Sequence, residues 1–176
     1  MADVRQVRLH PLCAGDAAAW AALHGDAVAM AHVAPPLAVD AARRRFDAAL
    51  RGNGERPPRR RTWTIVADDA FAGVAGLVFD APGTAELGAI LAPETHGRGV
   101  AMRALALVLA HAFATWPLRA VHTRHAAGHV AAARRPRRTN ATACATCTPT
   151  SRRIRGGTTS GSRRPNRCSS RPTTPG

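Results

Sequence analysis

Lysine and tyrosine are both missing from this sequence of 176 residues, so arginine supplies all 25 of its basic side chains. Without tyrosine, no phenol is available as a general acid. No apolar run approaches the roughly 18 residues that a membrane span needs, and the N-terminus lacks the apolar core of a signal peptide. We therefore expect a cytoplasmic protein with no membrane contact.

Acidic residues are scarce and unevenly distributed. The first 134 residues hold 15 arginines against all 11 acidic residues, whereas residues 135–176 hold ten arginines and no Asp or Glu. This tail has one large aliphatic residue, Ile154, and no aromatic residue. It cannot bury enough apolar surface to offset the entropy of ordering. The sequence thus predicts one domain at residues 5–134 and a disordered tail at 135–176.

Cysteine is also scarce, with four in the chain. Cys144 and Cys147 are separated by two residues and Cys168 follows, but no second closely spaced ligand pair accompanies them, so we predict no metal site. Cys13 is expected to be a buried thiol of the core. The ten tail arginines would attract phosphate, which leaves nonspecific nucleic-acid contact as an alternative function. No aromatic residue is present in the tail to stack on bases.

The most informative stretch, residues 85–116, reads as a strand, a glycine turn and a long helix. An apolar run ends at Pro93, which cannot donate to a sheet ladder. Gly97 and Gly99 then flank Arg98 where the helix begins. Unpaired N–H groups and the positive end of the helix dipole lie there, which suits a phosphate or pyrophosphate. The core face of this helix is predicted to contain Leu105, Val108, Leu109, Ala112, Phe113 and Trp116.

The remaining elements are expected on both sides of this stretch. Alternating or β-rich runs predict strands at 4–12, 62–67, 73–79, 85–92 and 118–125. Helices are predicted at 17–30, with Asp16 as its N-cap, and from a cap at Asp40 to Gly52. This order fits an α+β domain with a mixed, twisted β-sheet flanked by helices.

The segment containing Glu86-Leu87-Gly88, Pro93, the turn His-Gly-Arg-Gly-Val-Ala and the alanine-rich helix resembles the acetyl-CoA-binding core of the GNAT superfamily of N-acetyltransferases. It looks most like the branch that acetylates protein N-termini, including those of ribosomal proteins. The family pattern Gln/Arg-x-x-Gly-x-Gly/Ala runs here as His96-x-x-Gly99-x-Ala101, and Arg103-Ala104 replaces the usual Glu-Ala. The resemblance covers about residues 5–133.

The resemblance implies an enzyme that uses acetyl-CoA as co-substrate. The backbone of Ile90, Leu91 and Ala92 would pair with the pantetheine arm like an added strand. The pyrophosphate would lie on a turn and helix start formed by His96, Gly97, Arg98, Gly99, Val100 and Ala101. A later family helix opens near an Asn that touches the cofactor, and His129 stands in that position here.

The implied chemistry is attack of an amine on the thioester carbonyl. A base helps because the amine must be neutral, and Glu86 on the central strand is the candidate; Glu94, His122 and His125 are weaker ones. A protein α-amine has a pKa of about 7.7 to 8.0, against about 10.4 for lysine, and a thiol with a pKa of about 8.5 leaves fairly well without an acid. The expected acceptor is therefore a protein or peptide N-terminal α-amine; a small-molecule amine, such as an aminoglycoside, is the alternative.

The family pattern stops after residue 133, so we expect the C-terminal strands of the fold to be missing or altered, with part of the cofactor site open and activity impaired. An arginine-rich, lysine-free tail looks like a GC-rich coding sequence translated out of frame. Translating the gene in the other two frames tests this hypothesis, because one of them should yield a Leu-Gly-Phe-like continuation with alternating strands.

Overall fold

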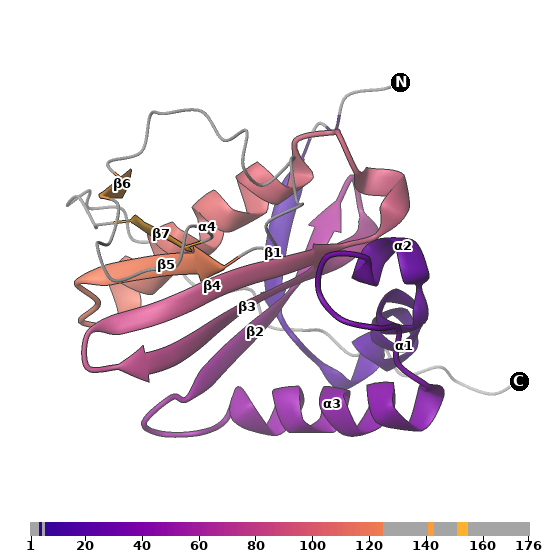
Figure 1. Cartoon of the computed structure of the whole chain (residues 1–176), viewed down its shortest axis with the longest axis horizontal. Coiled ribbons are helices and arrows are strands. Elements are labelled where there is room, and N and C mark those ends of the chain that lie inside the picture. The colour runs from indigo at the N-terminus through magenta and orange to yellow at the C-terminus, as the bar shows by residue number, and fades with distance from the viewer. Residues whose placement is uncertain (1–3, 5, 125–140, 143–150, 155–176) are drawn as a thin grey trace, which may run out of the picture.

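A computed structural model of the chain describes residue 4 and residues 6–124, 141–142 and 151–154 (Figure 1). The strands of this part are β1 (Val7–Pro11), β2 (Arg60–Ala67), β3 (Ala70–Ala81), β4 (Thr84–Leu91), β5 (Ala120–Arg124), β6 (Ala141–Thr142) and β7 (Ser151–Ile154). Its helices are α1 (Ala17–Gly25), α2 (Ala27–Met30), α3 (Val39–Gly52) and α4 (Val100–Thr115), with 3-10 turns η1 (Ala14–Asp16) and η2 (Pro93–Thr95). No helix in this part is both long and apolar enough to cross a membrane.

All seven strands form one sheet in the order β1-β2-β3-β4-β5-β7-β6. Every neighbouring pair is antiparallel except β4 and β5, which are parallel and joined by α4. This mixed, twisted sheet flanked by helices confirms the predicted α+β class (Figure 1). The last two strands have two and four residues. The expectation that the C-terminal strands of the fold are missing or altered stays a prediction.

Helices cover the two faces of the sheet differently. Helix α4 packs its buried residues Val100, Ala104 and Val108 against the face that carries Ile65 and Leu87. Helices α1 and α3 cover part of the opposite face, where Trp20 and Phe46 pack with other apolar residues. A register shift between Ile65 and Val66, opposite Gly73, changes which residues of β3 face each side.

Helix boundaries differ from prediction near the N-terminus. The expected helix at 17–30 is divided into α1 and α2, because Asp26 leaves the helical conformation and its Oδ1 accepts a hydrogen bond from the Ala29 N–H at 2.7 Å. Asp16 does not cap α1 with its side chain; its Oδ2 accepts from the Cys13 N–H instead. Asp40 lies in the first turn of α3, whose N-cap is Ala38.

The predicted boundary at 134/135 lies outside the described residues, as does most of the predicted tail. The part that is described, β6 and β7, adds to the sheet beyond β5: Val121 of β5 pairs with Ile154 of β7. The disorder predicted for 135–176 stays a prediction.

Candidate active site

Strands β4 and β5 separate part of the way along β4. They pair at only three positions, Thr84 with Ala120, Ala85 with Val121 and Glu86 with His122. On its other edge, β4 stays paired with β3 as far as Leu91, opposite Gly73. The second half of β4 therefore has an edge without a described partner strand, which is the edge that an extended ligand can use.

Residues at the end of β4 differ in whether their backbone groups can reach this edge. The Ile90 carbonyl lies so close to Gly73 of β3 that a side chain on Gly73 would clash with it. Because successive residues direct their backbone groups to opposite edges, those of Leu91 point away from β3. Ala92 donates its N–H to Ala72 at 3.0 Å, and its carbonyl accepts from Thr95 at 2.9 Å.

The pantetheine contacts expected at Ile90, Leu91 and Ala92 stay a prediction, and the strand geometry shows how the backbone groups of these residues are directed. Ala92 is unsuited to pair with a pantetheine arm, since both of its backbone groups are engaged within the protein. Ile90 faces β3, and Leu91 directs its backbone groups at the open edge, where its carbonyl accepts from the His96 ring at 3.1 Å and its N–H is the group directed at a ligand. The general location was predicted, but which residues face outward depends on the strand register.

The turn before α4 has the conformation that an anion site requires. Gly97 and Gly99 both have φ of +73°, a region that side-chain-bearing residues adopt only at a cost, and Gly99 is the N-cap of α4. A Cβ atom on either glycine would meet no protein atom within 4 Å. The turn is therefore lined by open space, and the first N–H groups of α4, including those of Val100 and Ala101, have no helical partners.

Side chains around the turn hold it in place. The His96 Nε2 is 3.1 Å from the Leu91 carbonyl oxygen, so a ring N–H there donates to the end of β4. Val100 is buried in the core, which leaves only its backbone for a ligand. Arg103, where the family branch has Glu, donates to the Val4 carbonyl and ties α4 to the N-terminal segment. These residues fit the pyrophosphate end of acetyl-CoA.

Three ionisable side chains meet where β4 and β5 begin to separate. His122 Nε2 lies 3.2 Å from Asp80 Oδ2 and 4.0 Å from Glu86 Oε2. Glu86 stands between the buried residues Ala85 and Leu87, which face α4, so its side chain lies on the opposite face of the sheet. The side chains of Asp80 and Glu86 are each 32% exposed, and that of His122 is 15% exposed.

Of the weaker candidate bases, His122 is brought into this cluster, whereas Glu94 is not. Glu94 is exposed in η2, after the end of β4. His125 and His129 lie outside the described residues. The sequence reasoning considered Glu86 and His122 separately and missed Asp80, because the contact among them depends on β3, β4 and β5 being neighbours. The register of the β3–β4 hairpin, with Val78 opposite Glu86, places Asp80 near Glu86. Predicting that register would have identified Asp80.

The strand order, the separation of β4 from β5 and the glycine turn at the start of α4 together define the acyl-CoA N-acyltransferase class of fold. The chain belongs to the GNAT acetyltransferase domain family, whose model matches residues 6–141. It is a GNAT-type N-acetyltransferase, with acetyl-CoA as co-substrate. Among curated proteins, no relative is found.

Solved structures share the fold at low sequence identity. A RimL ribosomal L7/L12 α-N-protein acetyltransferase in complex with coenzyme A is 14% identical, with 86% of this chain and 93% of that chain covered and a TM-score of 0.69. A spermidine N-acetyltransferase from Vibrio cholerae, in complex with CoA and spermine, is 20% identical, with 73% of this chain and 76% of that chain covered and a TM-score of 0.62.

A third structure extends the range of acceptors among these similar proteins. The aminoglycoside acetyltransferase AAC(6')-Ib, in complex with coenzyme A, is 11% identical, with 73% of this chain and 80% of that chain covered and a TM-score of 0.63. The names of the three proteins thus give one protein acceptor and two small-molecule acceptors. At these identities the likeness shows the fold and leaves the acceptor of the present chain open.

Proposed function

We propose that this chain acetylates the N-terminal α-amine of a protein or peptide, with Glu86 as the general base. The observation that carries the proposal is the position of the Glu86 carboxylate. It lies where β4 and β5 separate, on the face opposite α4, and at 4.0 Å from a histidine. An amine reaching this point would find a carboxylate to take its proton, directly or through one water.

Acetyl-CoA supplies an activated acetyl group as a thioester. The chain holds it by the Leu91 N–H at the open edge of β4 and by the N–H groups at the start of α4, those of Val100 and Ala101. Glu86 accepts the proton that the attacking amine loses. His122, which Asp80 contacts at 3.2 Å, positions that carboxylate.

The limited acid-base equipment of the site favours an α-amine. The chain has no tyrosine to protonate the leaving thiol. A single carboxylate base suits an amine that is already partly neutral at pH 7, as an α-amine is, better than a lysine amine with a pKa of about 10.4. The net charge of +4 on residues 1–134 also opposes a polyamine acceptor.

The second candidate is a small-molecule amine acceptor. It is supported by the similar folds of the spermidine and aminoglycoside acetyltransferases. Asp80 and Glu86 lie near each other and would attract a polycation locally, which is the specific feature in its favour.

The test is an acetyl-transfer assay on the full chain with four acceptors. These are a lysine-free peptide with a free N-terminus, an N-terminally blocked peptide with one lysine, spermidine, and an aminoglycoside. We expect turnover with the first peptide above the other three. Replacing Glu86 by Gln should lower kcat by about 10² to 10⁴-fold, the usual contribution of a general base, while acetyl-CoA binding stays unchanged.

Glu55→Gln is the matched control, because Glu55 is exposed in the loop before β2. It should leave turnover unaltered. Preference for spermidine or the aminoglycoside would replace the proposed acceptor with the second candidate. Full activity in Glu86→Gln would remove Glu86 from the mechanism, whatever the acceptor.

A further inference from the structure

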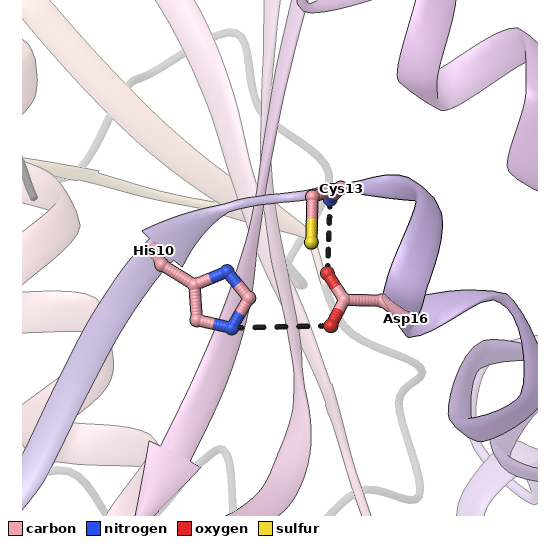
Figure 2. A group of neighbouring side chains, drawn as sticks. All are labelled: His10, Cys13 and Asp16. Carbon is pink, nitrogen blue, oxygen red and sulfur yellow. Dashed lines mark hydrogen bonds and ion pairs between the residues drawn. The ribbon is translucent and has the colours of Figure 1, made fainter. Parts of the chain in front are cut away.

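A second group of reactive side chains lies away from the acetyltransferase site, at the end of β1. His10, Cys13 and Asp16 come from β1, the following residues and η1, and their side chains are turned toward one another (Figure 2). One ligand atom from each residue lies within 4.8 Å of the other two, and all three residues are half-buried. Cys13 is thus more exposed than the core thiol expected from the sequence.

The orientation of the His10 ring is the first indication of a ligand. Its Nδ1 lies 3.0 Å from the Pro11 carbonyl oxygen, which only accepts, so Nδ1 carries a proton. In the neutral ring, Nε2 then has a lone pair, and it faces Asp16 Oδ1 at 3.9 Å. Two acceptors facing each other repel, and the gap is too long for a hydrogen bond. A cation between them would resolve both problems.

Asp16 is held by the groups around it in the orientation that a ligand needs. Its Oδ2 accepts from the Cys13 N–H at 2.9 Å and from the Thr64 hydroxyl at 2.8 Å. This leaves Oδ1 directed toward His10. A carboxylate fixed by outer hydrogen bonds and a histidine fixed by a backbone carbonyl are the usual supports of metal ligands. The Asp16–Cys13 contact alone is explained by capping of η1, but capping does not explain the position of His10.

We propose that His10 Nε2, Cys13 Sγ and Asp16 Oδ1 bind a divalent transition-metal ion of the zinc type. Nitrogen, sulfur and carboxylate oxygen are the ligands that zinc takes, and three protein ligands leave a fourth position for water. Binding forms a metal–sulfur bond and releases the thiol proton to solvent. The thiolate and carboxylate then neutralise the charge of the ion.

The ligand atoms, all within 4.8 Å of one another, would move closer on binding, the Cys13 Sγ by up to about 1.2 Å. Tetrahedral zinc with these ligands places the ligand atoms about 3.3 to 3.6 Å apart, so the His10–Asp16 gap would shorten by roughly half an ångström. The ion would link β1 to η1, and through Asp16 and Thr64 to β2. It would therefore stabilise this corner of the sheet without touching the acetyl-transfer site.

The test uses the full chain with Cys144→Ser, Cys147→Ser and Cys168→Ser, so that Cys13 is the one thiol left. Cobalt(II) is titrated and followed by the thiolate-to-cobalt charge-transfer absorption, and zinc is then added to displace it. We expect a saturable band from a single ion per chain, and a rise in melting temperature with zinc. In that background, Cys13→Ser should abolish the band and His10→Gln should weaken binding by about 100-fold or more.

His32→Gln is the matched control, since His32 is an exposed histidine in the α2–α3 loop, and it should bind as the parent does. Far-ultraviolet circular dichroism checks that each variant is folded. The proposal would be overturned if the chain without the three tail cysteines gave no charge-transfer band. It would also be overturned if His10→Gln, in that background, bound cobalt as tightly as the background itself. The last outcome would mean that His10 and Asp16 form an ion pair only.

Discussion

The two faces of β4 serve different purposes, although they alternate along one short strand. Ala85 and Leu87 point toward α4 and are at most 1% exposed, while Glu86 between them faces the other side with a 32% exposed side chain. The α4 face is apolar and closely packed. The opposite face combines a packed part under α1 and α3 with a part that no described helix covers, which holds Asp80, Glu86 and His122. The apolar packing and the ionisable side chains are thus separated by the period of two residues in a strand, and the proposed catalytic role of Glu86 belongs to the second face.

Leu87→Ala should give the largest effect and should act on stability. Leu87 is 1% exposed in the cluster under α4, and such truncations cost about 2 to 5 kcal/mol because a cavity remains. Urea unfolding of the parent and variant measures the loss. The neighbouring Glu86→Gln should cost less, about 0.5 kcal/mol, because glutamine keeps the size of this half-buried side chain and leaves no cavity. Similar stability losses for both variants would contradict the division between the faces.

Gly99→Ala should show that α4 serves both packing and cofactor binding. Forcing an L-residue into the left-handed region costs about 1 to 2 kcal/mol, and relief of that strain would move the N–H groups of the turn. We expect acetyl-CoA binding, measured by calorimetry, to weaken by about tenfold.

Gly88→Ala is the control for Gly99→Ala, because Gly88 has no positive φ and its Cβ would meet nothing within 4 Å. Acetyl-CoA affinity equal to the parent in Gly99→Ala would show that the turn does not contact the pyrophosphate.

His122→Gln should have a smaller effect than Glu86→Gln, since His122 acts through Glu86. We expect kcat to fall by about tenfold and the acidic limb of its pH profile to move, with the KM for acetyl-CoA unchanged. A variant that lost stability but kept the parental pH profile would give His122 a structural role alone. His122→Asn provides a shorter amide for comparison.

His24 tests the packed part of the opposite face through pH. Burial lowers its pKa below the usual value of about 6.5, against the opposing effect of its hydrogen bond to the Trp20 carbonyl. The stability of the folded state that depends on neutral His24 is complete above pH 6.5. It is lost as the pH falls toward the folded-state pKa, because the unfolded chain takes up the proton first.

The unfolding free energy should therefore decrease below pH 6.5, by at most about 1.4 kcal/mol per pH unit for this group. His24→Asn, which retains a donor near the Trp20 carbonyl, should flatten that decrease. His111→Asn is the comparison on α4: burial lowers the pKa of His111 as well, but this residue is more exposed, so its replacement should flatten the decrease less. An unchanged slope in His24→Asn would assign the pH dependence to other groups.

Much of the fold could be predicted because local signals agreed with it. Pro93, the two glycines and the apolar spacing of α4 fixed the strand, turn and helix at the centre of the domain. The break at Asp26 and the N-cap at Ala38 were missed, because short alanine-rich segments carry little periodicity to locate their ends. His125 and His129 lie outside the described residues, so those site predictions stay untested.

The amino-acid sequence alone indicated the class of the enzyme, because the segment from Glu86 through the glycine turn to the alanine-rich helix resembles the acetyl-CoA-binding core of the GNAT family, and the family model confirms it. It also determined what the chain lacks, above all a tyrosine acid. Only the tertiary structure decided which backbone groups face the open edge of β4, that Asp80 reaches His122, and that His10 lies against Asp16. Those contacts depend on strand register and on turns between elements, and a shift of one residue would direct each side chain to the other face of the sheet.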